Sequence, residues 1–183
     1  NIIKKYVKYV IISGYVSILL GRSRATEDID LFIGEINKEE FALMCKELDE
    51  NGFWCLNAEN IEEIFNYLEE GLAVRFARKK IPMPNFEIKF PKREIDKETF
   101  SDAINVILSK GELIISSLER QIVFKRYFLK SDKDKEDALH IEKTFKDELD
   151  YQKINKLRKI IEEIKREENG KGKKNFYEAW KNK

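Results

Sequence analysis

The chain has only two cysteines and one histidine among its 183 residues. Cys45 and Cys55 are too few and too plainly spaced for the disulfide framework of a small secreted domain or for a zinc site. We therefore expect reduced cysteines and a cytoplasmic protein. Long apolar runs are also missing, because none approaches the roughly 20 residues that a membrane-spanning helix needs. We predict no membrane span, and no signal peptide because no small-residue cleavage pattern follows the first apolar segment.

Charged residues make up 38% of the chain and apolar residues 42%, with a net charge of +1. This composition describes a heavily charged surface and a core large enough for one domain with a helical appendage. Abundant Lys, Glu and Ile are typical of proteins from hot environments, where ion-pair networks gain value. The charge is uneven: residues 151–183 carry eleven Lys and Arg against five Glu, so the tail is basic.

Two short motifs near the N-terminus predict the chemistry. Asp28 and Asp30 lie on a strand predicted over residues 28–33, where alternation places both carboxylates on one face. Neighbouring carboxylates repel each other unless a cation lies between them. Mg²⁺ suits that position, because it takes hard oxygen ligands and leaves room for substrate phosphates. The pair predicts a metal-dependent site that handles phosphates.

The second motif is the Ser13-Gly14 dipeptide, which follows an apolar strand predicted over residues 6–12. Residues 15–20 form a short apolar segment that ends at Gly21 and predict a helix. A helix start offers unpaired N–H donors and a partial positive charge, and a side chain on Gly14 would block the close approach of a phosphate.

Together these motifs resemble the nucleotidyltransferase superfamily, which has the polymerase-beta-like fold. The Arg24-Ala25-Thr26-Glu27-Asp28-Ile29-Asp30 run is similar to that of small, toxin-type prokaryotic members, although Ser precedes Gly in the first motif. The resemblance implies an α/β fold with a small mixed β-sheet flanked by helices. It also implies two Mg²⁺ ions during turnover and a nucleoside triphosphate as the substrate. A nucleoside monophosphate would pass to a hydroxyl acceptor.

The resemblance also implies roles for the remaining motif residues. Ser13 and the amide of Gly14 would cradle the outgoing pyrophosphate, and Lys125, or alternatively Arg24, would neutralise charge on the phosphates. Thr26 would contact the nucleotide or only cap the loop before the strand of Asp28.

The resemblance further implies a third carboxylate ligand from a later strand. Residues 86–90 alternate cleanly, and Glu87 is the best match by position and pattern, so Asp28, Asp30 and Glu87 are the predicted metal ligands. An ordinary solvated strand face is the alternative interpretation of Glu87 and Lys89. Glu112 is a second candidate for the third ligand, within a hairpin predicted over residues 103–115.

The other predicted elements complete a small α/β core over residues 1–116 and a helical region over residues 117–183. Asn37 predicts the start of a helix by capping it, and Pro82 and Pro84 predict a connector that cannot continue a central strand. The predicted segments are a helix over 38–50, a strand over 53–56, a helix over 61–69, a strand over 72–77 and the connector over 78–84.

A second constellation lies in the predicted helices after residue 117. Lys125, followed by Asp134 and Asp137, resembles the Lys and acidic pair that complete the site in toxin-type nucleotidyltransferases. The usual Arg four residues after the Lys is Leu129 here. The alternative is structural, because Ser131 and acids in the first helical turn cap and stabilise a helix without a catalytic task. His140 shares their face, where a packing or hydrogen-bonding role is expected.

The sequence does not decide whether the acceptor is RNA or protein. The basic tail with Phe176, Tyr177 and Trp180 would track RNA, dock a cognate antitoxin, or simply pack as a helix. Two other classes compete with the transferase: a catalytically silent module of the same fold that binds nucleotide, nucleic acid or a partner, and a metal-dependent nuclease.

Overall fold

The computed structural model describes the backbone of residues 2–181 and the side chains of residues 2–168. The chain divides into two compact units, residues 1–117 and residues 118–183. Within the described residues, no helix is both long enough and apolar enough to cross a membrane.

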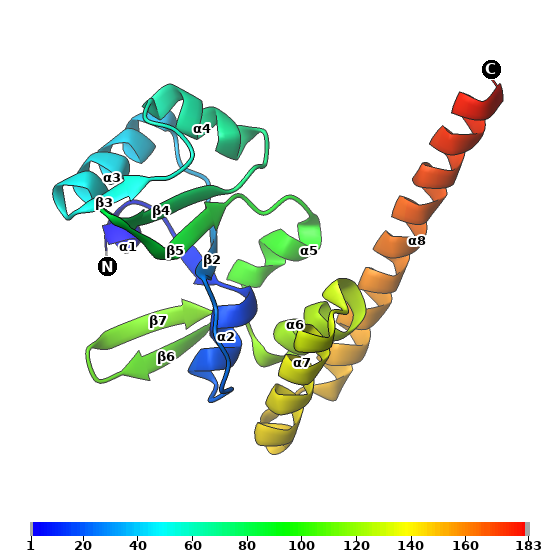
Figure 1. The fold of residues 1–183 in the computed structure, drawn as a ribbon. Helices are drawn as coiled ribbons and strands as arrows, with labels where there is room; N and C mark the ends of the chain where they lie inside the picture. Colours follow the sequence, from blue (N-terminus) through cyan, green and yellow to red (C-terminus); the bar gives the residue numbers. More distant parts are fainter. Residues whose placement is uncertain (1, 182–183) are drawn as a thin grey trace. The chain divides into compact units, whose positions relative to one another are not determined.

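The first unit is built on one seven-stranded mixed sheet in the order β3-β4-β5-β2-β1-β7-β6 (Figure 1). This confirms the predicted mixed α/β architecture. The strands are β1 (Tyr9–Ile11), β2 (Asp28–Ile33), β3 (Phe53–Cys55), β4 (Val74–Arg78), β5 (Ile81–Lys89), β6 (Ile104–Leu108) and β7 (Gly111–Ile115). The helices are α1 (Ile2–Tyr6), α2 (Ser13–Leu19), α3 (Lys38–Glu50), α4 (Ile61–Glu69) and the short α5 (Glu94–Lys97), which a 3₁₀ turn (Glu98–Phe100) follows.

Strand register gives the sheet two chemically different faces. β2 runs antiparallel to β1 and parallel to β5, so Leu31 pairs with Ile88 while Asp30 pairs with Glu87. Because successive side chains point to opposite faces, the apolar pairs gather on one face and the charged pairs on the other. The apolar face forms the core of this unit, and the charged face carries the predicted metal ligands.

Helices α3 and α4 pack with the strands at the β3 and β4 end of this sheet (Figure 1). Asn37 starts α3 by accepting a hydrogen bond from the amide of Glu40, and Asn60 caps α4 in the same way through Glu62. Both helices have the predicted bounds, because capping residues and glycine stops are local signals. Their apolar faces bury Phe41, Met44 and Leu68 completely.

The strand predicted over residues 6–12 is wrong in its first half. Residues 2–6 form the helix α1, and β1 is confined to Tyr9–Ile11. Five residues are too few for a stable helix alone, so α1 depends on its packing against α3, which no local sequence pattern signals.

The connector predicted over residues 78–84 is also wrong. β4 and β5 form a hairpin that turns at Lys79-Lys80, with Lys80 in the left-handed region at φ 68°, and β5 begins at Ile81. The ladder shifts register beside Arg78, so Pro82 and Pro84 fall in the irregular part of the pairing, where a missing N–H costs little.

The second unit is helical. It comprises α6 (Leu118–Val123), a π-helical segment (Phe124–Leu129), α7 (Asp132–Thr144), a 3₁₀ turn (Lys146–Glu148) and α8 (Tyr151–Lys181). The π-helical segment ends at Lys130, which lies in the left-handed region. Apolar residues of the three α-helices form its core, among them Ile122, Ile141 and Ile161.

We predict that Phe41→Ala destabilises the first unit by about 3–5 kcal/mol, because the Phe41 ring is fully buried and its loss leaves a cavity. Leu43→Ala on the same helix is the matched control, since Leu43 is 56% exposed and its loss should change stability by less than about 0.5 kcal/mol. Urea denaturation measures both, and equal effects would contradict the assigned core.

Candidate active site on the charged face of the sheet

Carboxylates from two parallel strands form a row on the charged face. Asp28 and Asp30 project from β2, and Glu87 lies directly across from Asp30 on β5. The side chains of Asp30 and Glu87 are 15% and 10% exposed, so Glu87 is not part of a solvated face. Two nearly buried acids at neighbouring positions need positive charge close by.

Lys89 supplies that charge. Its ammonium donates to Asp30 Oδ1 at 2.9 Å and lies 3.4 Å from Glu87 Oε1. Lys89 is two residues beyond Glu87 on the same strand face, so β-strand geometry itself places it beside both acids. Burial alone would lower the pKa of Lys89, but the carboxylates of Asp30 and Glu87 outweigh it and raise that pKa above its ordinary value.

Arg75 extends the row onto β4. Its Nε donates to Glu87 Oε2 at 2.8 Å, so the two oxygens of Glu87 are held by two different cations. Arg75 is half exposed, whereas Lys89 is mostly covered. The four charged groups of this row, Asp30, Lys89, Glu87 and Arg75, are therefore balanced in sign within one strip of the sheet.

Asn85 lies across from Asp28 in the same ladder. Its backbone N–H and its side-chain Nδ2 both approach the carbonyl of Glu27. Its Oδ1, by contrast, is buried and accepts no hydrogen bond from the described residues. A buried carbonyl oxygen without a donor is costly unless a ligand or cation satisfies it. Asn85 thus adds a neutral oxygen beside the carboxylate row.

The Ser13-Gly14 turn is tied directly to the strand of the two aspartates. The amide of Ile12 donates to the carbonyl of Asp30 at 2.9 Å, and α2 starts at the next residue. Ser13 has φ 64°, a left-handed conformation that costs a non-glycine residue about 1–2 kcal/mol. Strain of this kind persists only where the surrounding structure imposes it.

Arg24 packs over this turn. A Cβ added to Gly14 would lie 3.0 Å from Arg24 Nη2, so glycine is what allows the guanidinium to approach the backbone. The structure therefore brings together three of the residues predicted to bind phosphates, Ser13, Gly14 and Arg24. Thr26 donates through Oγ1 to the carbonyl of Asp28 at 3.1 Å, which stabilises the loop before β2.

The donor chemistry of the row fits Mg²⁺, which prefers carboxylate and carbonyl oxygens. Asp28, Asp30, Glu87 and the partnerless Oδ1 of Asn85 all belong to one face of β2 and β5. Among the described residues, no three His, Cys, Asp or Glu side chains stand close enough together to hold a metal ion. At Asp30 and Glu87, the oxygens that a metal would use accept from the ammonium of Lys89 instead.

The other candidate residues gather within the second unit. Lys125 is 1% exposed, and its ammonium donates to the fully buried Asp137 at 2.9 Å and lies 3.7 Å from Asp134. Ser131 accepts from the amide of Asp134, so α7 is capped as the structural interpretation expects. The burial of Lys125 and Asp137 distinguishes this pair from ordinary helix capping, which does not require a buried ammonium.

Three further residues, Arg126, His140 and Glu112, can be placed. Arg126 forms a two-pronged ion pair with Glu142 and so supports helix packing. His140 is half buried on α7, and Glu112, the alternative third ligand, forms an exposed ion pair with Lys4. The aromatic residues of the basic tail, Phe176, Tyr177 and Trp180, lie outside the side chains that the structure describes.

Comparison with solved structures identifies the fold. The chain matches the solution structure of the antibiotic-resistance factor ANT(2'')-Ia with a TM-score of 0.57 and 13% identity, over 92% of this chain and 89% of that one. It also matches a nucleotidyltransferase-like protein from Paracoccidioides brasiliensis with a TM-score of 0.50 and 16% identity, over 78% and 69%. No protein-family model matches this sequence, and neither does any curated protein sequence. The chain has the nucleotidyltransferase fold, as the sequence motifs predicted.

Lys89, Arg75 and Asn85 were missed as site residues by sequence reasoning. The alternation of residues 86–90 places Lys89 on the face of Glu87, and that signal was available. Arg75 and Asn85 come to the site only through the β4–β5 and β2–β5 registers, which no local pattern reveals.

We predict that Lys89→Met destabilises the protein by about 1–3 kcal/mol, because Asp30 and Glu87 lose their shared cation while they stay nearly buried. Added MgCl₂ should recover more stability in this variant than in the wild type, since a ligand of the native state stabilises it by mass action. Urea denaturation with and without the salt measures both effects.

Lys79→Met is the matched control, because its ion pair with Asp49 is at least half exposed and worth less than about 1 kcal/mol. A Lys89→Met protein that is as stable as the wild type, or one that gains nothing from Mg²⁺, would contradict the assigned role of the ammonium.

We predict that Lys125→Met costs about 3–5 kcal/mol, because Asp137 is left charged and buried. Combining it with Asp137→Leu should restore much of that loss, whereas Lys135→Met, an exposed pair with Asp132, should cost less than about 0.5 kcal/mol. Thermal and urea unfolding measure the series, and a double variant no more stable than Lys125→Met would show that the buried pair is not the cause.

Proposed function

We propose that this protein is a Mg²⁺-dependent nucleotidyltransferase that moves a nucleoside monophosphate from a nucleoside triphosphate to a hydroxyl acceptor. The observation that supports this most is the pairing of Asp30 with Glu87 on the charged face, joined by the Ile12–Asp30 hydrogen bond to the Ser13-Gly14 turn. The fold is shared with nucleotidyltransferase-like proteins, and nucleotidyl transfer is the chemistry that this fold suggests.

In this proposal, Asp28, Asp30 and Glu87 hold the metal, with Asn85 Oδ1 as an added oxygen. Mg²⁺ bound there would polarise the phosphates and lower the pKa of the acceptor hydroxyl. The acceptor oxygen forms a bond to the alpha-phosphorus, the bond to pyrophosphate breaks, and the hydroxyl proton is released. The protein contributes mainly charge and positioning, which supply most of the rate in phosphoryl transfer.

The turn at the start of α2 serves the leaving group. Ser13 and the amide of Gly14 bind the pyrophosphate oxygens, and Arg24 stands over Gly14 to balance charge that develops as the bond breaks. Lys89 would give up its contacts with Asp30 and Glu87 when a metal is held there, because the same carboxylate oxygens would bind the metal. The resemblance also implies a nucleotide-binding role for Lys125, Asp134 and Asp137 of the helical unit, where Lys125 and Asp137 are buried and paired with each other.

RNA and protein hydroxyls are the proposed acceptors, and a toxin of a toxin-antitoxin pair is the proposed biological class. The second candidate function is a catalytically silent module. The observation that favours it is Lys89, which already neutralises Asp30 and Glu87 without a metal.

We predict that purified protein with Mg²⁺, each α-labelled nucleoside triphosphate in turn and pools of RNA and protein transfers label to one acceptor class. Asp28→Asn and Asp30→Asn should reduce labelling more than about 100-fold, because loss of a metal ligand costs at least as much as loss of its supporting contacts. Asp49→Asn, an exposed acid of the same unit, is the matched control and should label normally.

Equal labelling by the wild type and the Asp30→Asn variant would remove the proposed site. Nucleotide binding without transfer to any acceptor would favour the silent module, and degradation of nucleic acid without a triphosphate would favour a nuclease.

A further inference from the structure

The β6–β7 hairpin extends beyond the strands that hold it in the sheet (Figure 1). The ladder between β7 and β1 consists of one pair, Ile115 with Ile11, whereas β6 pairs with β7 along its whole length. The outer part of the hairpin is therefore a two-stranded ribbon. Such a ribbon is marginally stable in water, and a third or fourth strand stabilises it.

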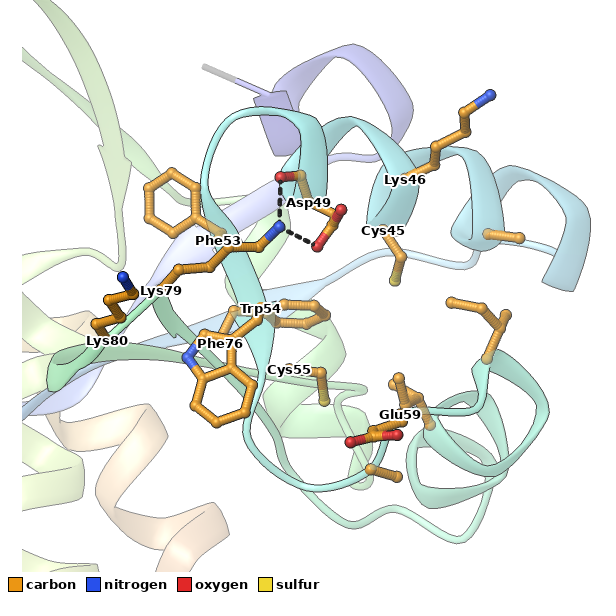
Figure 2. Close-up of a pocket in the computed structure, with 14 residues that line it drawn as sticks. Cys45, Lys46, Asp49, Phe53, Trp54, Cys55, Glu59, Phe76, Lys79 and Lys80 are labelled. Atoms are coloured by element: carbon orange, nitrogen blue, oxygen red, sulfur yellow. Dashed lines mark hydrogen bonds and ion pairs between the residues drawn. The ribbon is translucent and has the colours of Figure 1, made fainter.

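Strand β6 lies at the edge of the sheet and lacks the features that usually protect an edge. Its five residues, Ile104–Leu108, include no charged residue and no proline, and its ladder with β7 has no register shift. The opposite edge strand, β3, is only three residues long, and Figure 2 shows the ion pair of Lys79 with Asp49 next to Phe53 at its start. An unprotected edge offers its outward N–H and C=O groups to another strand.

Apolar side chains of β6 are in contact with solvent. Ile107 is 86% exposed, Leu108 and Ile104 are partly exposed, and Val106 is half-buried against the core. These residues follow one another along a single strand, so their exposed surface is continuous rather than scattered. Continuous apolar surface is typical of an interaction site.

The sequence of β6 is complementary to itself about its central residue, Val106. When a two-fold axis joins two antiparallel edge strands into one sheet, paired residues share a face, so the axis passes beside one residue that pairs with its own counterpart. An axis beside Val106 pairs all five residues of both copies and places Ile104 across from Leu108. Asn105 then lies across from Ile107, and the two Ile107 side chains become diagonal neighbours.

Charges on either side of the strand favour this register. Asp102 precedes β6 and the exposed Lys110 follows it, so an axis beside Val106 places Asp102 of each copy across from Lys110 of the other. Opposite charges across a strand pair stabilise it. An axis one residue earlier would place Asp102 across from Leu108, and one residue later would place Lys110 across from Ile104. The carboxylate of Asp102 also accepts a hydrogen bond from a hydroxyl of its own unit at 3.3 Å, which holds it near the start of β6.

We propose that this protein forms a symmetric homodimer in which β6 pairs antiparallel with β6 of a second copy, with the two Val106 residues opposite each other. The two hairpins then form one four-stranded ribbon, and each Ile107 is covered. Two five-residue strands bury less than the roughly 1,200 Å² at which standard interfaces begin, so we expect a weak dimer with a Kd between about 1 and 100 μM. The dimer does not depend on the proposed function.

Sedimentation velocity of the full chain over a range of concentrations measures the dimer. Ile107→Lys should raise the Kd at least about tenfold, because it removes apolar contact and brings two like charges together at the axis. Ile107 is so exposed that the variant should fold normally, which circular dichroism checks. Leu43→Lys is the matched control, since Leu43 is a large apolar residue exposed on α3, and its Kd should equal that of the wild type.

Cysteine cross-linking tests the register. Val106→Cys should form an intermolecular disulfide under mild oxidation, because opposed residues have Cα atoms about 4.5–5.5 Å apart, which a disulfide can span. Ile104→Cys alone should not, whereas a mixture of Ile104→Cys and Leu108→Cys should give the mixed disulfide. Non-reducing electrophoresis and mass spectrometry measure the products, and the oxidised wild type gives the background from Cys45 and Cys55.

A wild-type chain that stays monomeric at about 300 μM would overturn the proposal. A dimer that Ile107→Lys leaves at wild-type strength would do the same, because another surface would then hold it. Self-cross-linking of Ile104→Cys as fast as that of Val106→Cys would also overturn the proposed pairing. All of these measurements are made without nucleotide, so they are independent of nucleotidyl transfer.

Discussion

Charge compensation between adjacent strands is the constraint on which the first unit depends. The sheet buries Asp30 and Glu87 side by side, and the arrangement is tolerable only because Lys89 and Arg75 emerge from the same face. The four groups come from three strands, so the balance exists only when β2, β4 and β5 hold their register. A slip of one residue in any one of these strands would turn the charges of that strand toward the apolar core.

Two lysines of the described residues, Lys125 and Lys89, solve similar problems in different ways. Lys125 is completely enclosed and meets Asp137 inside a helical core, where neither partner can be exchanged without rearrangement of the helices. Lys89 stays 28% exposed and shares two acids, so solvent and ligands can reach its partners. The Lys125 pair is therefore fixed by the helical core, whereas the contacts of Lys89 stay open to solvent.

Sequence reasoning predicted the elements whose signals are local. The strand of Asp28 and Asp30, the helix capped by Asn37 and the hairpin that turns near Gly111 all follow from alternation, capping and turn residues. It failed where tertiary packing decides the outcome: α1 is held by α3, and the prolines of β5 are accommodated by a register shift. At the site, the resemblance anticipated Asp30 and Glu87 as ligands of one metal site. Asn85 reaches the site through the pairing of β2 with the sequence-distant β5, and Arg75 through the β4–β5 hairpin, which the predicted connector had excluded.

The glycine turn and the aspartates are joined along the chain by a loop, but they are positioned by the β1–β2 ladder and by the bond from Ile12 to Asp30. Residues 21–27 are held in place by the contacts of Gly21, Arg22, Arg24, Thr26 and Glu27 rather than by a regular element of their own. Evolution is free to lengthen or shorten this stretch while the geometry is preserved. Distant members of the fold are then better aligned by strand pairing than by counting residues between motifs, which helps to explain how a recognisable architecture survives at 13–16% identity.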